Sequence, residues 1–222
     1  MKNINLPQKL YKFMKPCYLK KIQKTNKIYI NHLNNYPESK YGSVIGDDLE
    51  GQASKNINLN SYVFHSKDRN TALGKEVSHF FNFEGVENFQ ITGGQLVLKE
   101  KDDNCYVYCL CQEYDDYVKK EFGESCLIIE DFPSFLNELN KSMSKKKKSL
   151  FAADKCLYLT DRERRFNPRD ADFNIIPGLI KDVKYKNQKE YRILWKNVDS
   201  SRIKEPLEIY CPQALKYCKF EY

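Results

Sequence analysis

The sequence predicts an α+β fold: a strand-rich, mostly antiparallel single domain over residues 1–222, with helices at its sides. Two observations favour this class. Segments of alternating polar and apolar residues recur along the chain and are joined by short turns, as in antiparallel sheets. Helical patterns occur in only a few places between them, without the regular strand–helix alternation of a parallel sheet.

The first part of the chain predicts two strands, one helix and a long loop. Residues 9–13 and 27–33 alternate in polarity and are expected to form strands. A helix is expected between them, because Pro16 fits a first helical turn and apolar residues follow at helical spacing. Residues 34–61 are polar and predict a long loop, which in a compact domain is usually functional or mobile.

The middle of the chain predicts a β-meander followed by helices. Residues 88–92 and 95–100 flank Gly93-Gly94, and a two-glycine link between alternating segments predicts a hairpin. Residues 105–112 are expected to form the next strand, and residues 113–123 a short helix. A longer helix is expected over residues 131–143, with a buried face of Phe132, Phe135, Leu136, Leu139 and Met143. The lysine-rich residues 144–148 after it are interpreted as a solvated linker.

The last third is rich in predicted strands, at residues 155–161, 178–185, 188–195, 206–210 and 215–220. A polar, arginine-rich loop separates the first two of them. In residues 188–195, one predicted face carries Gln188, Glu190, Arg192 and Leu194, and the other carries Lys189, Tyr191, Ile193 and Trp195. The polar face is either a solvated sheet surface with ion pairs or the floor of a site.

The net charge, the cysteines and the lack of long apolar runs limit the partners, metal sites and location that are expected. Lys and Arg number 37 against 30 for Asp and Glu, and the net charge of +7 mildly favours an anionic partner such as nucleic acid. Eight cysteines form no Cys-x-x-Cys pair and lie far from the three histidines, so we expect reduced core thiols rather than a zinc site. No apolar run approaches the length of a membrane span and no leader precedes the first strand, so a cytoplasmic location without membrane contact is expected.

Several common catalytic motifs do not occur in the sequence. Glycine-rich phosphate loops, Gly-x-Ser-x-Gly and His-Glu-x-x-His are missing. Three polar features remain as candidates for chemistry: the loop "GDDLEG" at residues 46–51, the arginine-rich residues 161–173, and the face of Gln188, Glu190 and Arg192.

Four short segments resemble a family of uncharacterised bacterial proteins. They are "LYKF" at residues 10–13, "GDDLEG" at 46–51, "YVYCLC" at 106–111 and "YKNQKEYRI" at 185–193. Members of that family begin with a Leu-Tyr-Lys-Tyr strand, carry an Asn-Asp-Pro-Phe-Glu-like loop and end with a Glu-x-Arg strand. The order of segments covers most of the chain, and this sequence lacks the proline of the loop.

The late "QKEYR" is also similar, more distantly, to ADP-ribosyltransferases of the toxin type. Those enzymes place a basic or imidazole residue on an early strand and a Gln-x-Glu or Glu-x-Glu pair on a late one. Lys12 matches the early position imperfectly, since His or Arg is usual there, and Gln188 and Glu190 match the late pair. The resemblance implies an ADP-ribosyltransferase-like fold and NAD as substrate.

The roles implied for these residues follow the chemistry of glycosidic cleavage. Loss of nicotinamide leaves an oxocarbenium-like ribose, which the carboxylate of Glu190 is expected to stabilise while Gln188 orients the acceptor. Lys12 or Arg192 is expected to neutralise the pyrophosphate. The rings of Tyr36 and Tyr41, in the long loop, are candidates for stacking on nicotinamide or adenine.

The leading hypothesis is therefore a bacterial or phage-encoded toxin or defence effector that uses NAD to modify a macromolecule. Nucleic acid is the favoured acceptor, and an inhibitory or antitoxin protein is a further candidate partner. Its structural signature would be one cleft bounded by Lys12 and Glu190. Two alternatives stay open: a non-catalytic nucleic-acid-binding protein that uses residues 144–148 and the arginine-rich loop, and a metal-dependent nuclease that uses Asp47, Asp48, Glu50 and Glu190.

Overall fold

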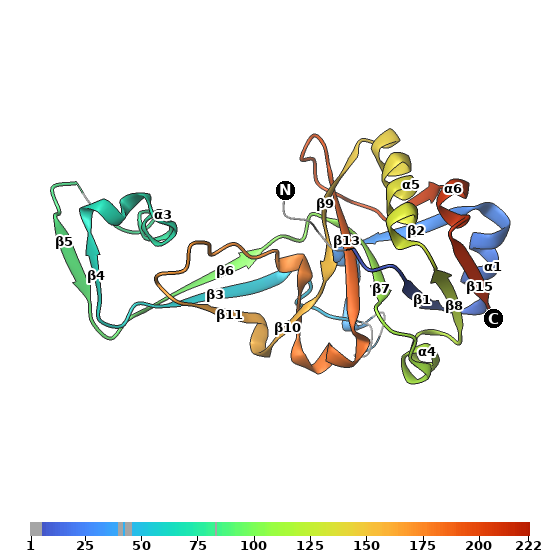
Figure 1. The fold of residues 1–222 in the computed structure, drawn as a ribbon, viewed down its shortest axis with the longest axis horizontal. Helices are drawn as coiled ribbons and strands as arrows, with labels where there is room; N and C mark the ends of the chain where they lie inside the picture. The colour runs from blue at the N-terminus through green and yellow to red at the C-terminus, as the bar shows by residue number, and fades with distance from the viewer. Residues whose placement is uncertain (1–5, 40–41, 43–45, 83) are drawn as a thin grey trace.

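A computed structural model describes residues 6–39, 42, 46–82 and 84–222. Figure 1 shows two parts, a body that contains β1 (Leu10–Met14) and the C-terminus, and a long arm that projects from it. Most strand pairs are antiparallel and the few helices lie beside the sheets, which confirms the α+β prediction. No helix of the described residues is long and apolar enough to cross a membrane.

The body is built on an eight-stranded sheet that forks at its central strand, β7. One edge of β7 pairs with β13, and β13 pairs with β9. The other edge pairs with β2 near the start of β7 and with β1 at its end, so the sheet divides into two branches. The strands are β1 (Leu10–Met14), β2 (Lys27–His32), β7 (Tyr106–Cys111), β8 (Ser125–Ile129), β9 (Lys148–Lys155), β13 (Glu190–Asn197), β14 (Leu207–Tyr210) and β15 (Cys218–Glu221).

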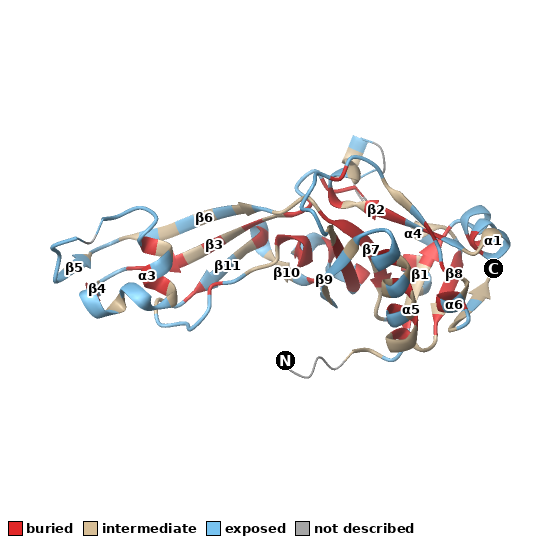
Figure 2. Cartoon of the chain, turned by 90° about the horizontal axis from the view of Figure 1, so that it is seen from above, coloured by how far each residue is buried: buried red, intermediate tan, exposed pale blue. Residues whose placement is uncertain are grey.

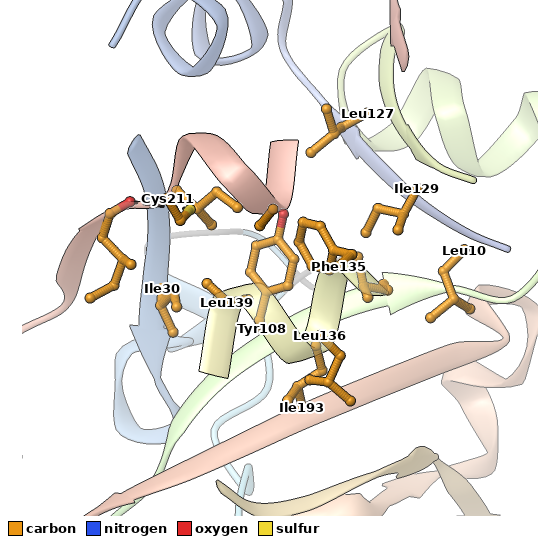
Figure 3. Close-up of a cluster of buried hydrophobic side chains, with 14 of the residues drawn as sticks. Leu10, Ile30, Tyr108, Leu127, Ile129, Phe135, Leu136, Leu139, Ile193 and Cys211 are labelled. Atoms are coloured by element: carbon orange, nitrogen blue, oxygen red, sulfur yellow. Dashed lines mark hydrogen bonds between the residues drawn. The ribbon is translucent and has the colours of Figure 1, made fainter. Parts of the chain in front are cut away.

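Helices pack against one face of this sheet and form the main core with it (Figure 3). They are α1 (Pro16–Thr25), α5 (Phe132–Lys145) and α6 (Pro212–Leu215). The five residues expected on the apolar face of α5 are all buried, which confirms that prediction. Asp131 caps the helix by accepting a hydrogen bond from the backbone N–H of Ser134 at 3.1 Å, and a proline follows in the first turn. Trp195 is fully buried and donates to Asn140 Oδ1 of α5 at 2.7 Å.

The arm contains a three-stranded and a two-stranded sheet with a small core of its own. Figure 2 shows buried residues along the arm that are separate from those of the body. Ile57, Phe64, Leu73 and Phe166 are among the buried residues of this second cluster. Its elements are β3 (Gln52–Asn58), β4 (Tyr62–His65), α3 (Ala72–Val77), β5 (Asn88–Ile91), β6 (Gln95–Lys101) and β11 (Glu163–Phe166).

The remaining elements are short and join these parts. They are α4 (Asp116–Phe122), β10 (Leu157–Leu159), β12 (Ile180–Asp182) and the 3-10 helices η1 (Leu33–Asn35), η2 (Ser66–Asn70), η3 (Thr160–Arg162), η4 (Pro177–Leu179) and η5 (Val183–Gln188). Strand β10 pairs in parallel with β12, which brings residues 180–182 beside the sheet.

Three predictions about local structure were wrong. The segments around Gly93-Gly94 do not pair with each other: β5 pairs with β4, and β6 pairs with β3. The two glycines lie at a kink in one side of a long hairpin, where the Leu59 N–H donates to the Gly94 carbonyl at 3.0 Å. The loop expected over residues 34–61 contains β3, whose alternation was hidden because the buried Lys55 occupies one of its inward positions. Residues 178–185 are a short strand between 3-10 helices rather than one continuous strand.

Because the arm has its own core, we expect it to open independently of the body. Phe64→Ala should cost about 3–5 kcal/mol locally, since it removes a buried ring from a small cluster. Amide exchange should then increase in β3, β4, β5 and β6 but remain slow in β7 and β13. Phe135→Ala, in the main core, serves as the control and should accelerate exchange in the body. Equal acceleration in both parts by Phe64→Ala would contradict an independent arm.

Candidate functional site

A pocket of about 110 Å³ lies where the sheet forks, beside the end of β7. Five of the six candidate residues border it: Lys12, Tyr36, Gln188, Glu190 and Arg192. Tyr41, the sixth, lies outside the described residues. The remaining lining is largely aromatic and sulfur-containing, with two further charged residues, and consists of Tyr11, Phe13, Glu50, Cys109, Leu110, Cys111, Phe122 and Lys181.

Strand β13 places Glu190 and Arg192 in this pocket. Glu190 lies opposite Cys111 and Arg192 opposite Cys109 of β7, while Tyr191 between them packs into the main core. The alternation expected for this strand is therefore present. The polar face is not a solvated sheet surface, because Glu190 is only 5% exposed and Arg192 only 1%.

Gln188 reaches the same site by a different route from the one expected. It ends the 3-10 helix η5 and is not part of the strand, because Lys189 adopts a left-handed conformation with φ of 41°. Its side-chain oxygen nevertheless accepts a hydrogen bond from Lys181 Nζ at 2.8 Å. Lys181 thus connects Gln188 to Glu190. The two residues therefore meet through a shared lysine, and not because they are two positions apart on one strand.

Charged groups in the site form a closed network. Arg192 donates to both carboxylate oxygens of Glu50, at 2.8 and 2.7 Å, and from Nε to Glu190 Oε1 at 2.9 Å. Its Nη1 also donates to the Gly178 carbonyl at 2.7 Å. Lys181 Nζ donates to the second oxygen of Glu190 at 2.8 Å. Two carboxylates therefore face two cations, and a bidentate arginine–carboxylate pair fixes their geometry.

The pKa values of Glu190, Lys181 and Arg192 shift so that these three groups keep their charge. Burial alone would raise the pKa of Glu190, but Arg192 and Lys181 outweigh burial and hold the pKa far below its ordinary value. Burial lowers the pKa of Lys181, and the attraction of Glu190 more than compensates, so that pKa is raised. Glu190 is an anion and Lys181 a cation at neutral pH.

The depressed pKa of Glu190 predicts a pH dependence of stability. A carboxyl whose pKa is lower in the folded state stabilises the fold above its unfolded value, here 4.5, and that contribution is lost as pH falls toward the folded value. The difference in unfolding free energy between wild type and Glu190→Gln should be constant near neutral pH and shrink below about pH 4.5. Urea titrations at several pH values measure it. A difference that stays constant down to pH 3 would contradict the shift.

Lys181 was missed by sequence reasoning. It is 3% exposed and stands 4.6 Å from the centroid of the Tyr185 ring, with its ammonium on Glu190. The available signal was a single lysine in the apolar segment "GLIKDV", since a lysine inside a buried strand needs a partner.

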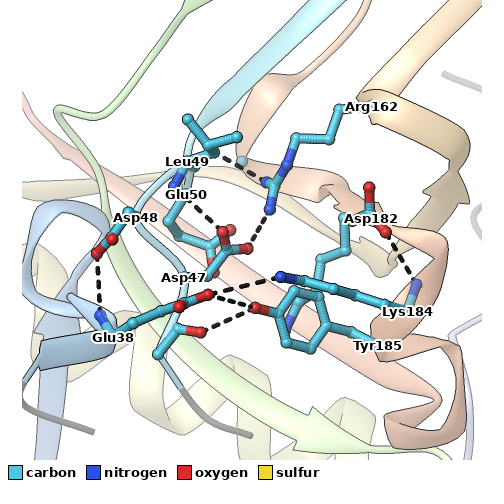
Figure 4. A network of polar contacts seen from close by, with 12 residues as sticks. Glu38, Asp47, Asp48, Leu49, Glu50, Arg162, Asp182, Lys184 and Tyr185 are labelled. Carbon is cyan, nitrogen blue, oxygen red and sulfur yellow. Dashed lines mark hydrogen bonds and ion pairs between the residues drawn. The ribbon is translucent and has the colours of Figure 1, made fainter. Parts of the chain in front are cut away.

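Two arginines hold the acidic loop at residues 46–51, and Figure 4 shows the one that pairs with Asp47. Glu50 pairs with Arg192, and Asp47 pairs with Arg162, whose Nη1 also donates to the Leu49 carbonyl at 3.0 Å. Asp48 accepts a hydrogen bond from the backbone N–H of Glu38 at 2.9 Å. The three acids thus have separate partners. Within the described part of the chain, no group of three or more His, Cys, Asp or Glu residues could hold a metal ion.

The expected relation between Lys12 and Glu190 was wrong in part. Tyr11, not Lys12, lies opposite Cys111 and so shares the sheet face of Glu190. By strand alternation Lys12 belongs to the opposite face, and its ammonium lies 5.1 Å from the centroid of the Tyr108 ring. Lys12 still borders the pocket because it stands at the fork, but its charge is directed at Tyr108.

The two thiols in the pocket are not nucleophiles at neutral pH. Burial, followed by the nearby charge of Glu190, raises the pKa of both Cys109 and Cys111 to about 12. A thiol with this pKa remains protonated, so it packs as a small apolar group.

The site is thus an ionised carboxylate in a small pocket with aromatic walls and no reactive thiolate. Comparison with protein-family models, with curated proteins and with solved structures gave no match. The chemistry of these residues is therefore the basis for any statement of function.

Proposed function

We propose that this protein is an ADP-ribosyltransferase-like enzyme that binds the nicotinamide end of NAD beside Glu190. One observation carries the proposal: a carboxylate whose pKa is held far below its ordinary value is buried in a pocket with rings of Tyr11, Phe13 and Tyr36 at its walls. Nicotinamide in NAD is a flat cationic ring, which aromatic side chains and a carboxylate both favour.

The reaction needs a negative charge where positive charge develops. The bond between ribose C1′ and the nicotinamide nitrogen breaks, its electron pair neutralises the pyridinium, and the ribose becomes oxocarbenium-like. Glu190 would stabilise that cation from its buried position, where a fixed charge acts more strongly than in water. A nucleophile of the acceptor would then attack C1′ and lose its proton. Gln188 would orient that acceptor.

The size of the pocket limits what it can enclose. Sites that bury a drug-sized ligand usually measure about 300–1,000 Å³. A pocket of about 110 Å³ has room for one ring-sized group. The nicotinamide end would therefore be enclosed, and the adenosine part of NAD would lie on the surrounding surface.

Arg192 takes a role other than binding the pyrophosphate. All three of its nitrogen atoms already donate to Glu50, Glu190 or Gly178. With Lys181 it holds the Glu190 carboxylate in place and ionised. Arg192 and Lys181 are thus positioning residues in this proposal.

The biological setting is proposed from the same resemblance to toxin-type transferases. A macromolecule would accept the ADP-ribose, and a toxin or defence effector would be controlled by an inhibitory or antitoxin protein. The net charge of +7 supports nucleic acid as the acceptor.

A second candidate is a non-catalytic nucleic-acid-binding protein. The observation in its favour is that Glu190 is already paired with two cations, so that the network is also suited to fastening the acidic loop and β12 to the sheet. In this case the pocket would have no substrate.

Incubation with NAD labelled in the nicotinamide ring separates the two candidates. The enzyme should release labelled nicotinamide, and with adenylate-labelled NAD it should transfer the label to a macromolecule when nucleic acid is present. No nicotinamide release under any of these conditions would support the non-catalytic candidate.

A further inference from the structure

One end of the body carries a concentration of positive charge. The first 37 residues of the chain contain eight lysines and no Asp or Glu. Four of them, Lys20, Lys21, Lys24 and Lys27, are exposed on α1 and at the start of β2. Figure 1 shows α1 and the C-terminus together at the end of the body that faces away from the arm.

Exposed tyrosines lie among these lysines. Tyr29 of β2 is 50% exposed, Tyr210 of β14 is 62% exposed, and Tyr222 after β15 is 52% exposed. Strand alternation explains the first two, because Ile28 and Ile209 turn into the main core and their neighbours turn outward. Because half or more of each of these side chains is exposed, the three tyrosine rings do not pack in the core.

Contacts show that these groups form one continuous surface. Lys27 lies opposite Tyr210 in the β2–β14 pair. Lys21 reaches from α1 to Glu208 of β14, at 2.5 Å, and this pair neutralises the acid beside Tyr29. Lys20 Nζ lies 5.9 Å from the centroid of the Tyr222 ring. The lysine–tyrosine surface is defined as Lys20, Lys21, Lys24, Lys27, Tyr29, Tyr210 and Tyr222.

We propose that the lysine–tyrosine surface binds single-stranded nucleic acid. Lysines neutralise phosphates along the strand, and exposed tyrosines offer flat faces on which unpaired bases stack. A duplex keeps its bases stacked inside and cannot use these rings, so the combination favours a single strand. This binding is independent of the NAD chemistry proposed above.

The surface continues into a hollow of about 650 Å³ that Tyr210 borders. Asn140, Lys141 and Lys145 of α5 and Gln213 of α6 line it. Lys145 can hold a further phosphate there, whereas Lys141 pairs at 2.6 Å with Glu138, which also lines the hollow. The side-chain amides can donate to base edges. The hollow thus gives the strand a path beyond Tyr210.

The arginine-rich residues 161–173, which include β11, are less suited to binding single-stranded nucleic acid. Arg164, Arg165 and Arg169 alternate with acids of the same segment, and Arg165 pairs with Glu163 at 3.0 Å. The positive charge of the loop is therefore balanced locally, in contrast to that of α1.

Fluorescence anisotropy with a fluorescein-labelled 20-nucleotide RNA of mixed sequence tests the proposal, with the same sequence as DNA and as a duplex. Tyr29→Ala and Tyr210→Ala should each weaken binding of the single strand by about tenfold. The triple variant K20Q/K24Q/K27Q should lower the slope of log affinity against log salt by about 2, since each phosphate contact contributes about 0.7. RNA and DNA arms decide which strand is preferred.

Matched controls lie on the arm. Phe80→Ala removes an exposed ring, and K67Q/K75Q/K99Q removes the same charge as the body triple from exposed positions. Both should bind as wild type. Equal losses from the two triple variants would reduce the interaction to net charge and overturn the proposal. Equal affinity for the duplex, or no binding of any probe by wild type, would also overturn it.

Discussion

Replacing Arg192 with methionine is expected to lower the free energy of unfolding by about 3–5 kcal/mol. Arg192 is 1% exposed and forms ion pairs with both Glu50 and Glu190. Its removal leaves these two buried carboxylates with only the charge of Lys181 to balance them. Urea unfolding followed by tryptophan fluorescence measures the loss, because Trp195 lies on the same strand.

An exposed arginine provides the control for this prediction. Arg165 pairs with Glu163 at 3.0 Å but is largely exposed, so Arg165→Met should cost less than about 1 kcal/mol. The variant R192M/E50Q/E190Q removes both uncompensated charges and should recover part of the loss. A loss in R192M as small as that in R165M would show that the network does not support the fold.

Replacing Glu190 with glutamine should lower the rate of nicotinamide release by about 10²–10³-fold. The amide keeps the shape of the carboxylate but carries no charge to stabilise an oxocarbenium-like ribose. The substitution also removes the negative charge that balances the buried cations Lys181 and Arg192, so a loss of stability is expected as well. A surface glutamate could be replaced without this loss. Rates must therefore be measured well below the melting temperature of the variant.

Asp47→Asn separates lost chemistry from lost stability. Asp47 is a buried carboxylate paired with Arg162, as Glu190 is with Arg192, but it does not line the pocket of about 110 Å³. Asp47→Asn should be destabilised like Glu190→Gln and should retain nicotinamide release. Equal loss of activity in both variants would assign the effect to folding.

Local patterns in the sequence were sufficient for the elements whose periodicity is regular. The helix over 131–143 and the strands at 106–111 and 190–195 are present because each has a regular local pattern, with a period of 3.6 in the helix and of 2 in the strands. The arm could not be predicted in this way. Its strands pair across long sequence separations, and Gly93-Gly94 marks a kink that local pattern cannot distinguish from a hairpin turn.

The candidate site was partly predictable for the same physical reason. Glu190 and Arg192 follow from strand alternation, and both line the pocket. Their partners Glu50 and Lys181 come from other elements, so only the fold brings them together. The early basic residue was assigned to the wrong face, because the pairing of Tyr11 with Cys111 depends on register between strands about 100 residues apart.

Saturation-transfer difference NMR of NAD with the protein tests the central claim most directly, namely that the pocket beside Glu190 holds the nicotinamide end of NAD. The nicotinamide ring protons should receive more saturation than the adenine protons, and free nicotinamide should compete for the signal. The effect should be weakened in Glu190→Gln and retained in Asp47→Asn. Stronger saturation of adenine, or no transfer to NAD at all, would contradict the account.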